Sequence, residues 1–212
     1  MAYNRENPVH FNSEEQLSIV TDQADDYVLD DFVRDMTMAV EQYNEDDKLV
    51  TEAERLVGKL VRGISWLPPE KQNPKAEIYA RHTLFVDPKN RFEVMALVWQ
   101  PGQCTPLHDH DGTWGAEGVL VGRIKVTNFI QADVISGDVV RLVKTGTVIV
   151  NAQCTGQLLP PADCHILEAV GDQIAITIHV YGKQLRKFRV FEPLKEEGIY
   201  VTRDHFVDYT EV

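Results

Sequence analysis

The stretch Gly102–His110, with the sequence GQCTPLHDH, is the part of this chain that decides its fold. It contains two histidines separated by one residue, His108 and His110. Side chains alternate between the faces of an extended strand, so these imidazoles project from one face and Asp109 from the other. Two neighbouring imidazoles can bind one cation, and the alternative is an exposed polar pair at the start of a strand. The pair alone leaves both interpretations open.

Composition restricts the classes of protein that remain. The chain has 212 residues, a net charge of -12 and 43% hydrophobic residues, which predicts one folded domain. The negative charge argues against nucleic acid or an anionic membrane surface as the main partner. No apolar run approaches the roughly 20 residues of a membrane helix. Residues 1–11 lack a signal-peptide core, so we expect a cytoplasmic protein. Its three cysteines form no CxxC pair, which excludes a disulfide framework and a zinc ribbon.

The first 70 residues have a helical pattern. Apolar residues recur at steps of three and four, which predicts one helix near 24–45 and another near 51–65. Two pairs have the spacing of a capping box, namely Ser13 with Gln16 and Thr51 with Glu54. Pro68 and Pro69 cannot continue a helix, so we place a boundary there. The expected organisation is a helical region over 1–70 and a β-rich region over 71–212.

Short apolar or alternating runs, separated by turn residues, fill most of the second region. About eight such runs are typical of an antiparallel sandwich or barrel. They are Tyr79–Val86, Phe92–Trp99, Gly118–Ile130, Val139–Val143, Thr147–Val150, Cys164–Val170, Ile174–Tyr181 and Phe188–Phe191. The tail from Tyr200 fits either a strand or a loop.

The spacing around the histidine pair resembles the two sequence motifs of the cupins. Gly102 lies six residues before His108, and His165 opens a later apolar run, as in the second motif. Gly115 replaces the glutamate of the first motif, and the second motif has Cys154, Ala162 and Ala169 at other family positions. The resemblance implies a mainly β fold: a cupin-type antiparallel β-barrel, or double-stranded β-helix, with the N-terminal helices packed on it.

The cupin resemblance implies a metal site made of His108, His110 and His165. Three neutral imidazoles leave open coordination positions, as a catalytic metal requires. Zn(II), Fe(II), Mn(II), Ni(II) and Cu(II) all suit such a ligand set. Glu117 follows His110 by seven residues and falls outside the motif, so we do not expect it to be a ligand.

Two further groups have residue types that suit catalysis. Thr177, His179 and Tyr181 alternate along one run, so they share a face and can form a hydrogen-bonded relay. The alternative is a partly buried polar face of a barrel strand. Arg81 in Tyr79-Ala80-Arg81 offers a bidentate fork to a carboxylate, and the alternative is a surface arginine.

Together these motifs resemble the cysteine dioxygenase family of thiol dioxygenases over residues 79–182. The resemblance implies that His108, His110 and His165 hold Fe(II). It also implies that Arg81 binds the substrate carboxylate and that Thr177, His179 and Tyr181 support catalysis. We assign Tyr79 and Trp114 to the same substrate-binding region. Gly115 stands where animal members have a cysteine that crosslinks to the tyrosine, so we expect no crosslink on Tyr181.

The implied activity is oxidation of a small carboxylated thiol by O2 to a sulfinic acid. Cysteine, 3-mercaptopropionate and mercaptosuccinate all remain candidate substrates, and the oligomeric state is not predicted. Arg186 or Arg189 could meet a second carboxylate, or both are solvated surface charges. Cys164 is expected to face away from His165 as a core cysteine. Two other functions stay open: a metal cupin of another reaction class, such as an isomerase or non-thiol dioxygenase, and a non-enzymatic binding module.

Overall fold

Two α-helices and ten β-strands make up the part of the chain that the computed structural model describes, residues 27–207. The helices are α1 (Leu29–Gln42) and α2 (Asp46–Leu60), followed by a short 3-10 helix at Pro69–Gln72. The strands are β1 (Ala80–Val86), β2 (Glu93–Trp99), β3 (Gly115–Val121), β4 (Arg123–Ser136), β5 (Val139–Asn151), β6 (Thr155–Leu158), β7 (Cys164–Ala169), β8 (Ala175–Tyr181), β9 (Lys187–Pro193) and β10 (Ile199–Phe206).

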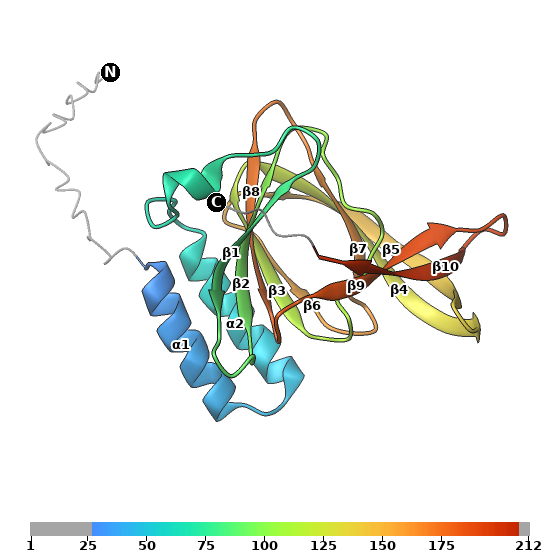
Figure 1. Cartoon of the computed structure of the whole chain (residues 1–212), viewed down its shortest axis with the longest axis horizontal. Coiled ribbons are helices and arrows are strands. Elements are labelled where there is room, and N and C mark those ends of the chain that lie inside the picture. Colours follow the sequence, from blue (N-terminus) through green and yellow to red (C-terminus); the bar gives the residue numbers. More distant parts are fainter. Residues whose placement is uncertain (1–26, 208–212) are drawn as a thin grey trace, which may run out of the picture.

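The strands form two five-stranded sheets in which all strand pairs are antiparallel. One sheet has the order β1-β2-β8-β3-β6 and the other has the order β7-β4-β5-β10-β9. Figure 1 shows the helices on the outer side of the first sheet and the second sheet extending away from them. The expected mainly β barrel with helices packed on it is therefore confirmed.

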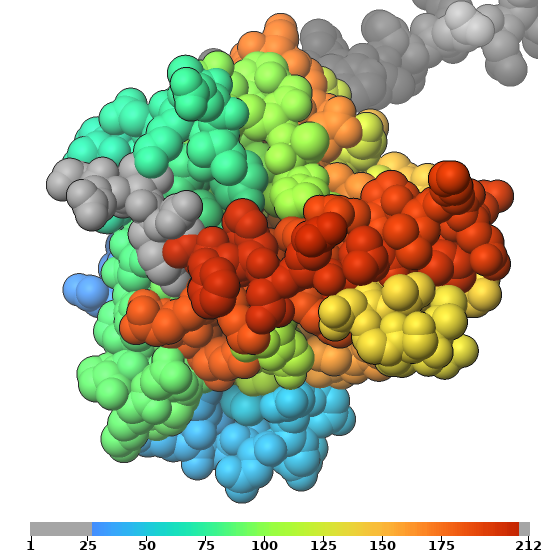
Figure 2. Space-filling view, turned by 45° about the vertical axis from the view of Figure 1, so that its right-hand side comes forward, coloured from blue at the N-terminus to red at the C-terminus, as the bar shows by residue number. Residues whose placement is uncertain are grey.

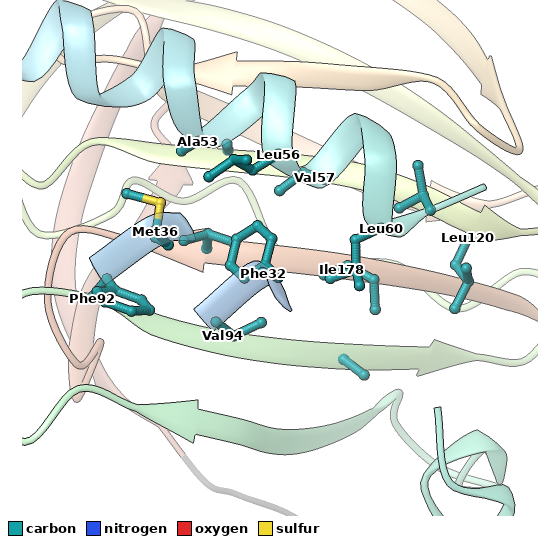
Figure 3. Close-up of a cluster of buried hydrophobic side chains, with 14 of the residues drawn as sticks. Phe32, Met36, Ala53, Leu56, Val57, Leu60, Phe92, Val94, Leu120 and Ile178 are labelled. Carbon is teal, nitrogen blue, oxygen red and sulfur yellow. The ribbon is translucent and has the colours of Figure 1, made fainter. Parts of the chain in front are cut away.

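The central strands β2 and β8 are buried on both faces, and their alternation separates two environments. Every residue of these two strands is buried. One set of alternating residues, including Val94 and Ile178, contacts the helices (Figure 3). The other set, including Met95 and His179, faces the barrel interior. The inner face of this sheet therefore carries the polar residues that a site requires.

The helices bury one apolar stripe against this sheet. Phe32 from α1 and Leu56 from α2 are completely buried in the shared core. Gly118 on β3 permits this close approach, because a Cβ there would lie 2.7 Å from Cγ1 of Val57. The helical region and the barrel thus share one hydrophobic core.

The second sheet contains a long β4–β5 hairpin that the sequence analysis divided incorrectly. The run Gly118–Ile130 is two strands, because the chain turns at Gly122 with a φ of 77°. The runs Val139–Val143 and Thr147–Val150 are one strand, because a bulge accommodates the intervening residues. The tail forms β10, which pairs with β5 and β9. In Figure 2 these C-terminal strands, in red, lie beside the yellow hairpin.

The helix limits also differ from expectation. The second helix begins at Asp46, so Thr51 is inside it and donates its hydroxyl hydrogen to the Asp47 carbonyl at 2.7 Å. A capping role for Thr51 is therefore wrong. The first helix spans Leu29–Gln42, and the Ser13–Gln16 pair lies outside the described residues. Over residues 27–207, no helix has the length and apolar character needed to cross a membrane.

Candidate metal centre

Three histidines from two segments meet inside the barrel. His108 and His110 lie on the extended segment that precedes β3, and His165 is on β7. Backbone hydrogen bonds hold these segments together: His165 N–H donates to the His108 carbonyl at 3.0 Å, and His108 N–H donates in return at 3.2 Å. One ring nitrogen from each histidine lies within 4.8 Å of the others. This arrangement suits a single metal ion.

The surroundings of each ring indicate which nitrogen faces the metal position. Nδ1 of His108 is 3.0 Å from the Pro106 carbonyl oxygen, so it carries the hydrogen and donates. Nδ1 of His110 is 3.5 Å from Oδ2 of Asp163, and that oxygen also accepts the His110 backbone N–H at 3.2 Å. Metal-ligating histidines commonly donate their second N–H to such oxygens. For His108 and His110, this pattern leaves Nε2 for the metal.

Burial keeps these imidazoles in the form that can bind a metal. The pKa values of His108 and His165 lie well below the usual 6.5, mainly because burial disfavours the charged ring. Neighbouring imidazoles lower them further. In the described part of the chain, Nε2 of His110 and Nε2 of His165 are buried without a hydrogen-bond partner. A bound cation would satisfy both atoms, so the donor set fits a metal.

A second set of polar residues lies on β8 beside these histidines. Trp99 Nε1–H donates to Oγ1 of Thr177 at 3.0 Å, and that hydroxyl lies 2.7 Å from Nε2 of His179. Thr177 can therefore donate its own hydrogen to His179, which places the imidazole hydrogen on Nδ1. Nδ1 lies 3.2 Å from Oη of Tyr181, which leaves the phenol hydrogen available to a ligand in the site.

Electrostatics hold this set neutral. The pKa of His179 is lowered to about 3 by burial, by the positive charge of Arg81 and by His110. The pKa of Tyr181 is raised far above 10, chiefly by burial, so its phenol keeps its hydrogen. The Tyr181 ring is stacked on the His110 ring with centroids 5.5 Å apart. The phenol therefore lies next to the metal position as a hydrogen-bond donor.

Arg81 is on β1, the edge strand of the same sheet, and Tyr79 directly precedes that strand. Arg81 is opposite Leu97 in the strand register, and its Nη2 lies 3.7 Å from Sδ of Met95 on the inner face. Tyr79 is buried and stacks on Trp99 with ring centroids 4.3 Å apart. The structure therefore places a guanidinium beside the histidines and the relay.

Trp114 occupies a different place from the other predicted site residues. Its side chain belongs to the buried cluster beneath the helices, on the outer face of the sheet. A Cβ at Gly182 would lie 2.4 Å from its Nε1, so the indole packs directly on that glycine. Contact with substrate stays a prediction for Trp114. Its neighbour Gly115 lies directly opposite Tyr181, where a Cβ would be 3.1 Å from the tyrosine ring.

Several further residues that the sequence analysis considered lie around the metal position and do not face it. The carboxylate of Asp109 points away from the metal position, as expected, and accepts hydrogen bonds from Arg189 N–H at 2.8 Å and Nε–H at 2.6 Å. Arg189 is thus engaged with Asp109, while Arg186 is exposed. Cys164 is buried in a separate apolar cluster, and burial raises its thiol pKa to about 12.

The sequence analysis considered Glu117 only as a metal ligand, did not expect it to be one, and gave it no other role. This residue on β3 faces His165 and His179 and lines a partly open cavity of about 160 Å³ between β5 and β6. Burial raises its carboxyl pKa to about 8, whereas a divalent cation nearby would favour the carboxylate. Its alternation with Gly115 along one strand was the available signal, because both face inward.

Comparisons with solved structures return proteins of low sequence identity, one of which is a cupin 2 conserved barrel domain protein. TT1209 from Thermus thermophilus is 15% identical with a TM-score of 0.42, covering 54% of this chain and 91% of that one. A cupin 2 conserved barrel domain protein from Salinispora arenicola is 18% identical with a TM-score of 0.40, covering 55% and 87%. An oxalate oxidase is 21% identical with a TM-score of 0.36, covering 46% and 45%.

The fold and the site together define an antiparallel β-barrel with a three-histidine centre that could hold a metal. The family model described as cysteine dioxygenase type I matches residues 74–193, which is more than half of the chain. The chain therefore belongs to the cysteine dioxygenase type I family.

Proposed function

We propose that this protein is an iron-dependent thiol dioxygenase that converts a small carboxylated thiol and O2 into the sulfinic acid. The observation that carries the proposal is the convergence of three different groups on the interior of the barrel. These are the three-histidine set, the Arg81 guanidinium and the neutral relay ending at Tyr181. Membership of the cysteine dioxygenase type I family supports the same activity.

His108, His110 and His165 would hold the iron through Nε2. When bound there, Fe(II) would supply electron transfer to dioxygen and open coordination positions. The three neutral ligands add no negative charge, so an anionic thiolate would balance the charge of the cation. The overall conversion adds both oxygen atoms to sulfur. Sulfur supplies the electrons that dioxygen takes up, so the reaction needs no separate reductant.

Arg81 would bind the substrate carboxylate and thereby fix the direction of the thiol. A guanidinium and a carboxylate form two parallel hydrogen bonds, which define an orientation as well as an affinity. The charge of Arg81 already acts on this part of the barrel interior: it adds to the effect of burial in lowering the pKa of His179, and it offsets part of the rise that burial causes in the pKa of Tyr181. A small acid bound at Arg81 would therefore lie beside the relay and the three histidines.

Tyr181 would donate its phenol hydrogen to the reacting sulfur or oxygen. His179 orients the phenol by donating Nδ1–H to it, and Thr177 fixes that tautomer from the other side of the ring. Preorganised donors of this kind stabilise developing negative charge without reorganising during the reaction. Burial of all three residues excludes competing water.

The test is oxygen consumption by iron-loaded protein with cysteine, 3-mercaptopropionate, mercaptosuccinate, cysteamine and no thiol. The proposal expects uptake with at least one carboxylated thiol and a sulfinate product identified by mass. Uptake with cysteamine alone would contradict the role of Arg81. Absence of uptake with every thiol, from protein shown to contain iron, would overturn the proposed activity.

A further inference from the structure

Glu117 is an acidic residue that faces the metal ligands but lies outside the cupin motif. It is on β3 directly opposite His179 on β8, and its neighbour on the other side, Gly156 on β6, has no side chain. The Glu117 side chain is only 14% exposed. A buried carboxyl group needs partners that compensate for lost hydration.

Each oxygen of Glu117 faces the Nδ1 atom of a different imidazole. Oε2 lies 3.4 Å from Nδ1 of His179, and Oε1 lies 3.8 Å from Nδ1 of His165. Within residues 27–207, Oε2 and Nδ1 of His165 are both buried without a hydrogen-bond partner. To reach the usual upper limit of about 3.2 Å, the His179 contact must shorten by about 0.2 Å and the His165 contact by about 0.6 Å, and such contacts commonly tighten when a ligand binds.

We propose that Glu117 is a positioning residue that holds the metal ligand His165 and the relay residue His179 at the same time. Oε1 accepts Nδ1–H from His165, whereas Oε2 shares the Nδ1–H of His179 with the phenol oxygen of Tyr181, so both rings present Nε2 away from the carboxylate. The other two metal ligands have the same arrangement, because Nδ1 of His108 faces the Pro106 carbonyl oxygen and Nδ1 of His110 faces the Asp163 carboxylate. The role of Glu117 depends on the metal site of the proposed function but not on the identity of the substrate.

The contact also connects the two sheets of the barrel. Glu117 and His179 are in the first sheet, whereas His165 is on β7 in the second. A carboxylate bound to both rings fixes the orientation of the metal ligand relative to the relay. Loss of such an outer carboxylate typically weakens metal binding or activity by about 10–100-fold.

The test compares Glu117→Leu, Glu117→Gln and the control Gln157→Leu. Gln157 is on β6, lines the same cavity and bonds to Glu54 on the outside, so the control removes a polar group without touching the imidazoles. Two readouts are used in the full chain: the affinity for Zn(II), from competition with a chromophoric chelator, and the imidazole tautomers, from ring-nitrogen NMR of the metal-free protein at a pH above 8, where the Glu117 carboxyl is ionised. Neither readout needs thiol or dioxygen, so failure of the proposed activity would be distinguishable.

The wild-type protein and the control should show hydrogen on Nδ1 of both His165 and His179. Glu117→Leu should weaken zinc binding by about 10–100-fold and mix the tautomers of His165, whereas His179 should keep its tautomer because Thr177 fixes it from the other side of the ring. Glu117→Gln keeps one oxygen acceptor, so its effects on the His165 tautomer and on the zinc affinity should be intermediate. If Glu117→Leu fails to fold, the zinc affinity and the tautomers of Glu117→Gln still test the proposal. Wild-type tautomers and wild-type affinity in the folded variants would overturn the proposal.

Discussion

Replacing Arg81 by alanine should weaken the binding of a carboxylated thiol. Arg81 is partly buried on the inner side of β1, and its charge reaches His108, His179 and Tyr181. A hydrogen bond between charged partners contributes about 1.5–3 kcal/mol, and about 1.4 kcal/mol corresponds to a factor of ten. The KM for the best carboxylated thiol should therefore rise by about 10- to 150-fold.

Steady-state oxygen uptake over a range of thiol concentrations measures this change. Arg81→Lys should fall between the wild type and Arg81→Ala, because lysine keeps the charge but cannot form the bidentate pair. Arg62→Ala is the matched control, since Arg62 is exposed at the end of α2, away from the barrel interior. Any turnover of cysteamine should be unaffected in KM, because cysteamine has no carboxylate. An unchanged KM for the carboxylated thiol in Arg81→Ala would refute the proposed binding of the substrate carboxylate by Arg81.

Four other predictions concern the metal site and the fold. His165→Ala removes one of three ligands, so metal content after purification should fall, and full retention would show that this ligand is misassigned. Asp163→Ala should weaken Zn(II) binding by about 10–100-fold in a chelator competition, because His110 loses its facing carboxylate. Phe32→Ala should lower the free energy of unfolding in urea by about 3–5 kcal/mol, since Phe32 is fully buried, and a negligible change would contradict the core assignment. Arg91 lowers the pKa of Asp87 from 3.8 to about 2, so this pair stabilises the fold above pH 3.8 and the contribution is lost as the pH falls through about 2. Acid unfolding curves of Asp87→Asn should lack that loss.

Local periodicity predicts which side chains of the site share a face. Alternation along one strand is enough to place Thr177, His179 and Tyr181 on a common face, and the structure joins them by hydrogen bonds. The spacing of His108 and His110 is equally local. The match of the third histidine, His165, came from a family pattern, and backbone pairing between the two segments explains why it meets the others.

The features that were missed depend on contacts between distant segments. Glu117 approaches His165 only because two sheets close into a barrel, and no local pattern specifies that distance. The sequence analysis divided β5 into two runs. It is one strand because its pairing with β4 continues on both sides of a bulge. The start of α2 at Asp46 was missed because Thr51 has the residue type of a cap but bonds within the helix. Trp114 was assigned by analogy, and its side chain lies in the buried cluster beneath the helices.

The most direct test of the central claim is to follow dioxygen labelled with the heavy oxygen isotope into the product. Iron-loaded protein is incubated with the preferred carboxylated thiol, and the product is analysed by mass spectrometry. The account predicts a sulfinate that carries two labelled atoms from dioxygen, with no such product from His165→Ala. A disulfide, or a product that takes its oxygen from water, would contradict dioxygenation at sulfur by this three-histidine centre.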